Sequence, residues 1–88
     1  MLNNLRDYFS IKHSSLFDEK YYLLHNPDVR RADVDPLMHF VKYGWKEGRN
    51  PSEDFDIQLY LQSKPSLLSA DINPLVDYLR SGGAPANQ

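Results

Sequence analysis

Residues 17–44 read FDEKYYLLHNPDVRRADVDPLMHFVKYG and, 38 positions later, residues 55–82 read FDIQLYLQSKPSLLSADINPLVDYLRSG. The two stretches align without a gap, and ten of the 28 aligned pairs are identical. The identical residues are Phe17, Asp18, Tyr22, Leu23, Pro27, Ala32, Asp33, Pro36, Leu37 and Gly44. Aspartate, proline and glycine among them are types that commonly begin or end helices. Such a shared pattern is typical of a tandem structural repeat. We therefore predict two copies of one 38-residue unit.

Each copy opens with a pattern that is typical of a helix N-terminus. In the first copy Phe17 precedes Asp18, and a second aromatic residue, Tyr22, lies five positions after the first. The aspartate can accept hydrogen bonds from unpaired N–H groups of the first turn, while the two aromatic rings pack together. A proline then disfavours the α conformation of the residue before it. The pattern predicts helices over about residues 19–25 and 57–63, closed by Pro27 and Pro65.

A second helix is predicted in each copy at Asp35-Pro36 and Asn73-Pro74, where a capping residue precedes a proline at the first helical position. Gly44 and Gly82 are expected to end these helices in a left-handed conformation. Apolar residues recur at i, i+3 and i+4, which predicts a stripe facing the core: Leu37, Phe40 and Val41, and in the second copy Leu75, Tyr78 and Leu79.

The expected fold class is all-α, with two tandem helix-turn-helix repeats and a short N-terminal helix. Residues 1–14 are predicted to form that helix and to cap the open end of the first repeat, as terminal elements of repeat proteins generally do. Residues 15–52 are assigned to repeat 1 with its linker, residues 53–83 to repeat 2, and residues 84–88 to a disordered tail. The small size and the loose tail are expected of a segment of a longer polypeptide.

Composition excludes several classes of partner. Ten basic and twelve acidic residues give a formal charge of −2, so no basic field favours nucleic acid. The chain has no cysteine, which excludes disulfides and thiolate metal sites. Neither a signal peptide nor a membrane span is readable at the N-terminus, so membrane insertion is not expected. A cytoplasmic location is the default expectation, with contact to the inner face of the membrane through partners.

The one motif that suggests enzyme chemistry is Asp33-Val34-Asp35, which has the Asp-x-Asp form that glycosyltransferases use to hold a metal and a sugar nucleotide. Its counterpart Asp71-Ile72-Asn73 also precedes a proline, so a helix start explains both. The three histidines lie on different segments without the i+3 or i+4 spacing of a helical metal site. We therefore predict no catalytic, cofactor-binding or metal-binding residue, and a chain that is not an enzyme.

The motif FDEKYYL, NPDV, DPL.HF and GWKEGRNP across residues 17–51 resembles a bacterial repeat module. Such modules are attached to glycosyltransferases and rhamnan-synthesis-type proteins of surface-polysaccharide assembly. The resemblance covers most of residues 15–83, and it implies a place beside an enzyme without being its catalytic part. The second copy departs from the motif, with Lys64-Pro65-Ser66-Leu67 in place of NPDV.

The resemblance and the helical pattern together predict a non-catalytic interaction module of a larger protein. It would position or assemble a surface-polysaccharide glycosyltransferase through contacts with a protein partner or an attached glycosyltransferase domain. An accessory module that binds an oligosaccharide is the alternative. Self-association is a further expectation, because an open-ended repeat stack leaves an apolar end.

A binding surface is predicted in the tract that joins the two copies. Its residues do not recur in the second copy, and Trp and Arg are favoured at binding hot spots. Trp45 allows a second interpretation, in which it packs over the junction of the repeats, because tryptophan is usually largely buried. The candidate residues are Tyr43, Trp45, Lys46, Glu47 and Arg49.

Overall fold

The structure is a computed structural model that describes residues 2–82, and it is built of short helices. Within residues 2–82 there is no strand; an isolated β-bridge pairs Ser52 with Phe55. The prediction of an all-α chain is confirmed, whereas the tail expected at residues 84–88 lies outside the described residues. In chain order the helices are α1 (Leu2–Lys12), α2 (Glu19–His25), α3 (Pro27–Ala32), α4 (Pro36–His39), the π-helix η1 (Phe40–Gly44), α5 (Ile57–Ser63), α6 (Ser66–Ser69) and α7 (Pro74–Arg80).

Helices α2 and α5 have the predicted bounds and the predicted caps. A carboxylate oxygen of Asp18 accepts a hydrogen bond from the backbone N–H of Tyr21 at 3.0 Å, and Asp56 accepts one from Leu59 at 3.0 Å. The Phe17 and Tyr22 rings pack with their centroids 5.1 Å apart. The cap and the aromatic contact therefore set how the chain enters these helices.

Helices α3 and α6 were missed by the sequence prediction, which expected two helices in each copy. Asn26 ends α2 with φ −134° and ψ 72°, and Pro27 begins α3 immediately afterwards. A proline is unfavourable inside a helix but suits its first position, where no N–H is needed. Pro27 therefore separates two helices rather than closing a single one.

The prediction for Gly82 is confirmed by its φ of 90°, but the prediction for Gly44 is wrong. Gly44 is the last residue of η1, where the N–H of Trp45 donates to the carbonyl of Phe40 at 3.1 Å. It is buried, and a Cβ at this position would overlap the hydroxyl oxygen of Tyr22. Glycine is needed at position 44 for close approach and not for a left-handed turn.

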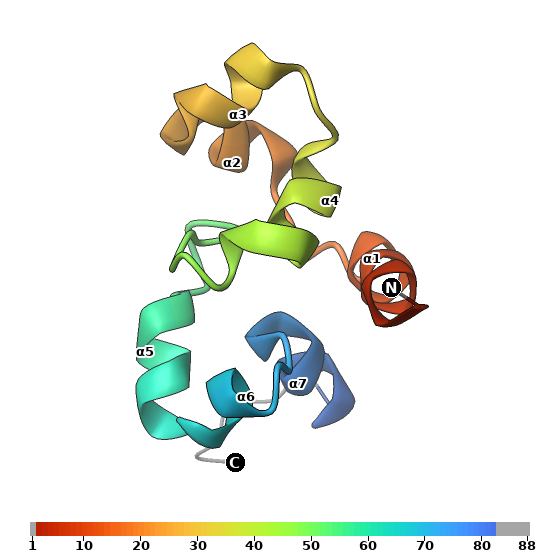
Figure 1. Cartoon of the computed structure of the whole chain (residues 1–88), viewed down its shortest axis with the longest axis vertical. Coiled ribbons are helices and arrows are strands. Elements are labelled where there is room, and N and C mark those ends of the chain that lie inside the picture. The colour runs from red at the N-terminus through yellow and green to blue at the C-terminus, as the bar shows by residue number, and fades with distance from the viewer. Residues whose placement is uncertain (1, 83–88) are drawn as a thin grey trace.

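Helix α1 lies at the waist of the molecule, beside α4 and η1 on one side and α7 on the other (Figure 1). It was expected to cap the open end of the first repeat; it contacts α4 and η1 of the first half and also α7 of the second half. Ile11 is the residue by which it enters the core, with 1% of its surface exposed. One continuous core thus joins both halves: Ile11, Tyr22, Val29, Leu37, Phe40, Val41, Trp45, Ile57, Leu75 and Val76.

Candidate functional site

Trp45 belongs to the core and is only 2% exposed, so the prediction that it lines a binding surface is wrong. The second interpretation of this residue agrees with the structure, since Trp45 shares its cluster with residues of both halves. Exposed positions of the predicted surface are Tyr43, Lys46 and Glu47, and 55% of Tyr43 is exposed.

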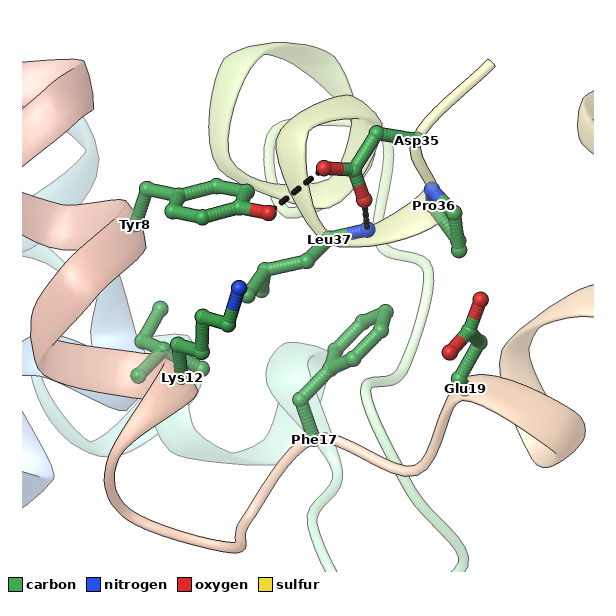
Figure 2. Close-up of a pocket in the computed structure, with 8 residues that line it drawn as sticks. Tyr8, Lys12, Phe17, Glu19, Asp35, Pro36 and Leu37 are labelled. Carbon is green, nitrogen blue, oxygen red and sulfur yellow. Dashed lines mark hydrogen bonds between the residues drawn. The ribbon is translucent and has the colours of Figure 1, made fainter.

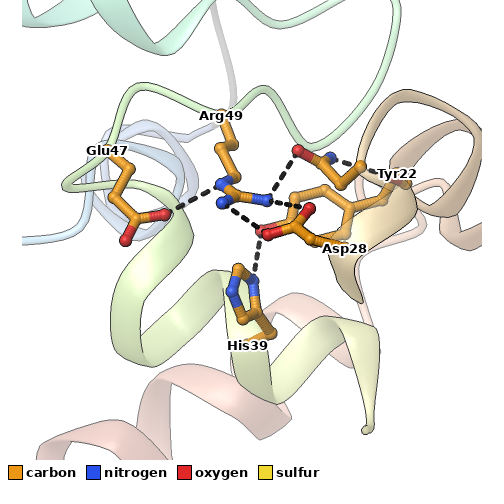
Figure 3. A network of polar contacts seen from close by, with 6 residues as sticks. Tyr22, Asp28, His39, Glu47 and Arg49 are labelled. Carbon is orange, nitrogen blue, oxygen red and sulfur yellow. Dashed lines mark hydrogen bonds and ion pairs between the residues drawn. The ribbon is translucent and has the colours of Figure 1, made fainter. Parts of the chain in front are cut away.

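Arg49 is held by four hydrogen bonds (Figure 3). Its guanidinium donates twice to the carboxylate of Asp28, at 3.0 and 2.9 Å, and once to the side-chain oxygen of Asn26 at 2.9 Å. Its Nε donates to Glu47 at 2.8 Å. A two-pronged arginine–carboxylate pair fixes orientation as well as distance. Arg49 thus fastens the joining tract to the corner between α2 and α3.

The charge of Arg49 alters the titration of its neighbours. Its hydrogen bonds lower the pKa of Asp28 to about 2. Tyr22 lies next to this pair (Figure 3), and burial raises the pKa of its hydroxyl. That hydroxyl lies 2.8 Å from Nδ1 of His39, whose pKa is lowered first by burial and then by the positive charge of Arg49. His39 is therefore a neutral partner of a buried tyrosine at pH 7.

A corresponding set of polar contacts lies 38 positions later. The Tyr60 hydroxyl donates to Oδ2 of Asp77 at 2.9 Å, in the place of the Tyr22–His39 contact. Lys64, which aligns with Asn26, donates to the same oxygen at 2.9 Å. Burial favours protonation of Asp77, yet the hydrogen bonds from Lys64 and Tyr60 outweigh it and lower its pKa. The tyrosine thus keeps a polar partner in both halves, while the identity of that partner changes.

The remainder of the joining tract connects the two halves. The Asn50 side chain accepts a hydrogen bond from the N–H of Ile57 at 2.8 Å, at the start of α5. The carbonyl of Pro51 accepts one from the N–H of Asp18 at 2.9 Å, just before α2. Lys46 forms an ion pair with Asp71 at 2.8 Å. The tract was predicted to bind a partner because its residues do not recur. In the structure its main contacts instead join the two halves of the chain.

A hollow that sequence reasoning missed lies between α1 and the start of α4, and it has a volume of about 210 Å³ (Figure 2). The Tyr8 hydroxyl closes one side by donating to Oδ2 of Asp35 at 2.6 Å. No single motif announces this hollow, because its residues come from three separate segments. They are Tyr8, Ile11 and Lys12, then Phe17 and Glu19, then Asp35, Pro36 and Leu37.

The Asp-x-Asp motif has the structural role that the sequence favoured. Asp33 is the left-handed residue that ends α3, with φ 56°, and Asp35 accepts a hydrogen bond from the N–H of Leu37 at 3.1 Å. Within residues 2–82, no group of three or more His, Cys, Asp or Glu side chains is placed to hold a metal ion. The motif therefore ends α3 at Asp33 and begins α4 at Asp35.

Comparisons with protein-family models, with curated proteins and with solved structures found no match to this chain. Across the part of the chain that the structure describes, no helix has the length and apolar character needed to cross a bilayer.

Proposed function

We propose that the chain is a non-catalytic helical interaction module made of two copies of one unit. In this proposal it positions or assembles a bacterial surface-polysaccharide glycosyltransferase through protein contacts. The motif of residues 17–51, which resembles modules attached to such enzymes, supplies the context. The observation that carries the proposal is a set of large apolar side chains left exposed on short helices.

Matched backbone angles support the two-copy organisation. The N-caps Asp18 and Asp56 have φ −102° in both cases, with ψ 103° and 106°. The following C-caps, Asn26 and Lys64, have φ −134° and −137°. Asp33 and Asp71 are both left-handed, with φ 56° and 59°. Agreement at positions that differ in side chain, such as Asn26 and Lys64, favours a shared backbone design.

The exposed apolar side chains support a protein partner. Leu24 is 78% exposed, Leu59 63% and Leu68 54%. Leu24 on α2 and Leu59 on α5 occupy helices whose opposite faces supply the buried Tyr22 and Ile57. By contrast, the polar groups of the Arg49 cluster are bonded to one another. When a partner removes exposed apolar side chains from water, the free energy of the complex is lowered.

The test is a calorimetric titration of the 88-residue chain with the glycosyltransferase polypeptide of the same polysaccharide assembly system. We expect saturable binding, weakened at least about tenfold by Leu24→Ser combined with Leu59→Ser, since each substitution removes an apolar side chain that the partner would bury. Gln62→Ser is the matched control, because Gln62 lies 38 positions after Leu24 and is also exposed. Absence of binding, or equal weakening by the control, would contradict the proposal.

The mass of the chain in solution separates a partner from self-association. Light scattering of the chain alone should give the mass of a monomer, 10.2 kDa, if the exposed leucines serve a different protein. A concentration-dependent dimer that Leu24→Ser dissociates would assign these residues to a second copy of the chain instead.

A further inference from the structure

The hollow between α1 and α4 has a volume that suits one small ring. Its volume is about 210 Å³, and a cavity of about 150 Å³ suffices for benzene. Typical drug-sized ligands need more, about 300–1,000 Å³. The hollow therefore suits a single six-membered ring with its substituents.

Its floor is apolar and its rim is polar. Ile11, Pro36 and Leu37 are buried side chains of the floor, and Phe17 is half-buried beside them. Figure 2 shows Lys12 reaching over the floor from α1 and Glu19 facing it from the start of α2. A ring with one apolar face could lie on this floor with its edge directed to the rim.

The rim carries charges of both signs. Lys12 supplies an ammonium group that lies 5.6 Å from the centre of the Tyr8 ring, and no ion pair of Lys12 or Glu19 occurs among the described residues. Asp35 supplies a second carboxylate, whose two oxygens already accept one hydrogen bond each, from the Tyr8 hydroxyl and from the backbone N–H of Leu37. With two carboxylates and one ammonium group the rim opposes an anionic ligand, while a cationic ligand is attracted by the carboxylates and repelled by Lys12.

Hydroxyl groups can bond to rim groups of either sign. A hydroxyl donates to a carboxylate and accepts from an ammonium group, so a neutral ring with several hydroxyls can satisfy both signs at once. We propose that this hollow is a binding site for one neutral pyranose residue of a glycan. The ring lies on Phe17 and Leu37, and its hydroxyls bond Glu19, Asp35 and Lys12.

This site differs from the predicted tract around Trp45 and is separate from the exposed leucines of the proposed protein contact. Failure of either proposal therefore leaves the other standing, because the two are tested with different ligands and different variants.

The experiment is an NMR titration of the whole ¹⁵N-labelled chain with the methyl pyranosides of glucose, galactose and mannose, to about 100 mM. At least one should cause saturable shifts at the backbone amides of Lys12, Glu19 and Leu37, with a dissociation constant of about 1–10 mM, as expected for a small open site. The charged comparator is methyl glucuronide, which should bind at least about threefold more weakly than the neutral sugar because the two rim carboxylates repel it. Cyclohexylmethanol, which lacks the ring hydroxyls, should bind more weakly still.

Two single variants test the rim without removing the floor. Glu19→Gln and Lys12→Met should each weaken the neutral sugar about three- to tenfold, because each removes a charge-assisted hydrogen bond. Glu53→Gln and Lys20→Met are the matched controls, since both residues are exposed and lie outside the hollow. Unchanged amide positions away from the hollow verify that each variant is folded.

Three results would overturn the proposal: no saturable shift at these amides with any of the three neutral pyranosides, tighter binding of methyl glucuronide, or wild-type affinity in both rim variants. Weakening by the rim variants alone, with the controls like the wild type, supports it.

Discussion

At the scale of single residues, the contact between Gly44 and Tyr22 makes a strong demand on the sequence. A Cβ at position 44 would overlap the tyrosine hydroxyl, and Tyr22 is fully buried and cannot swing into solvent. We expect Gly44→Ala to lower the free energy of unfolding by about 1–3 kcal/mol, the range for overpacking a core. Urea unfolding followed by circular dichroism measures the loss.

Removing the hydroxyl tests the cause of this loss. In a Tyr22→Phe background, Gly44→Ala should cost less than in the wild type, because the atom it overlaps is gone. Gly82→Ala is the control: its φ of 90° is unfavourable for alanine, but a Cβ there meets no atom within 4 Å. Its cost should be the same in both backgrounds, and a Gly44→Ala cost that did not change would contradict the clash.

The Asp28–Arg49 pair should make stability depend on pH in a defined window. The pKa of Asp28 falls from an ordinary 3.8 to about 2 in the folded chain. A depressed pKa stabilises the fold above the unfolded value and loses that contribution as pH falls through the folded value. The stability difference between wild type and Asp28→Asn should therefore be full at pH 5 and shrink between about pH 4 and pH 2.

Unfolding free energies of both proteins across this range would verify the effect. In an Arg49→Met background the Asp28→Asn substitution should matter much less, because the partner that contributes most to the lowered pKa is absent. A difference that stayed constant from pH 5 to pH 2 would show that Asp28 contributes by another route.

At the scale of helices, the caps should contribute similarly in both halves. Asp18→Ala and Asp56→Ala should each lower the unfolding free energy by about 0.5–2 kcal/mol, because each leaves a first-turn N–H without its partner. Asp18→Asn and Asp56→Asn keep a capping oxygen and serve as controls with smaller losses. Thermal or urea unfolding compares the four variants, and a loss as large in the Asn variants as in the Ala variants would rule out capping.

The elements that sequence predicted well are those whose signals are local. The bounds of α2 and α5 follow from an aspartate cap and a proline within ten residues, and both ends are set by those residues themselves. Helix α3 was missed because a proline can follow the end of one helix and also occupy the first position of the next, and Pro27 does both. The short helix α6 has no side-chain cap to announce it, so the same error recurs after Pro65.

The joining tract was misread for a different reason. Residues that do not recur between the two aligned stretches seem free to serve function, but the junction between the two halves of the chain also occurs only once. Trp45 fills the core at that junction, and Arg49 reaches back to Asp28. Which of these two roles applies depends on contacts across more than twenty residues of chain, which periodicity does not encode. The hollow lined by Tyr8 and Asp35 was unpredictable on the same grounds.

At the scale of the whole molecule, the two halves and α1 form one folding unit. Ile57 and Leu75 of the second half lie in the same core as Tyr22 and Phe40 of the first, and α1 adds Ile11. A chain of 88 residues buries only about 60–65% of its extended surface, so neither half has a spare core of its own. The two halves of the chain are therefore not expected to unfold independently.

Truncating one leucine in each half tests this unity. Leu37→Ala and Leu75→Ala should each cost about 2–5 kcal/mol, because Leu37 is 7% and Leu75 0% exposed. Trp45, the single tryptophan, reports on the junction through its fluorescence, while circular dichroism reports on all helices. In each variant the two signals should fall at one shared urea midpoint, as in two-state unfolding. If Leu75→Ala moved the dichroism midpoint and left that of Trp45 in place, the second half would unfold alone, and the core would be two cores in contact.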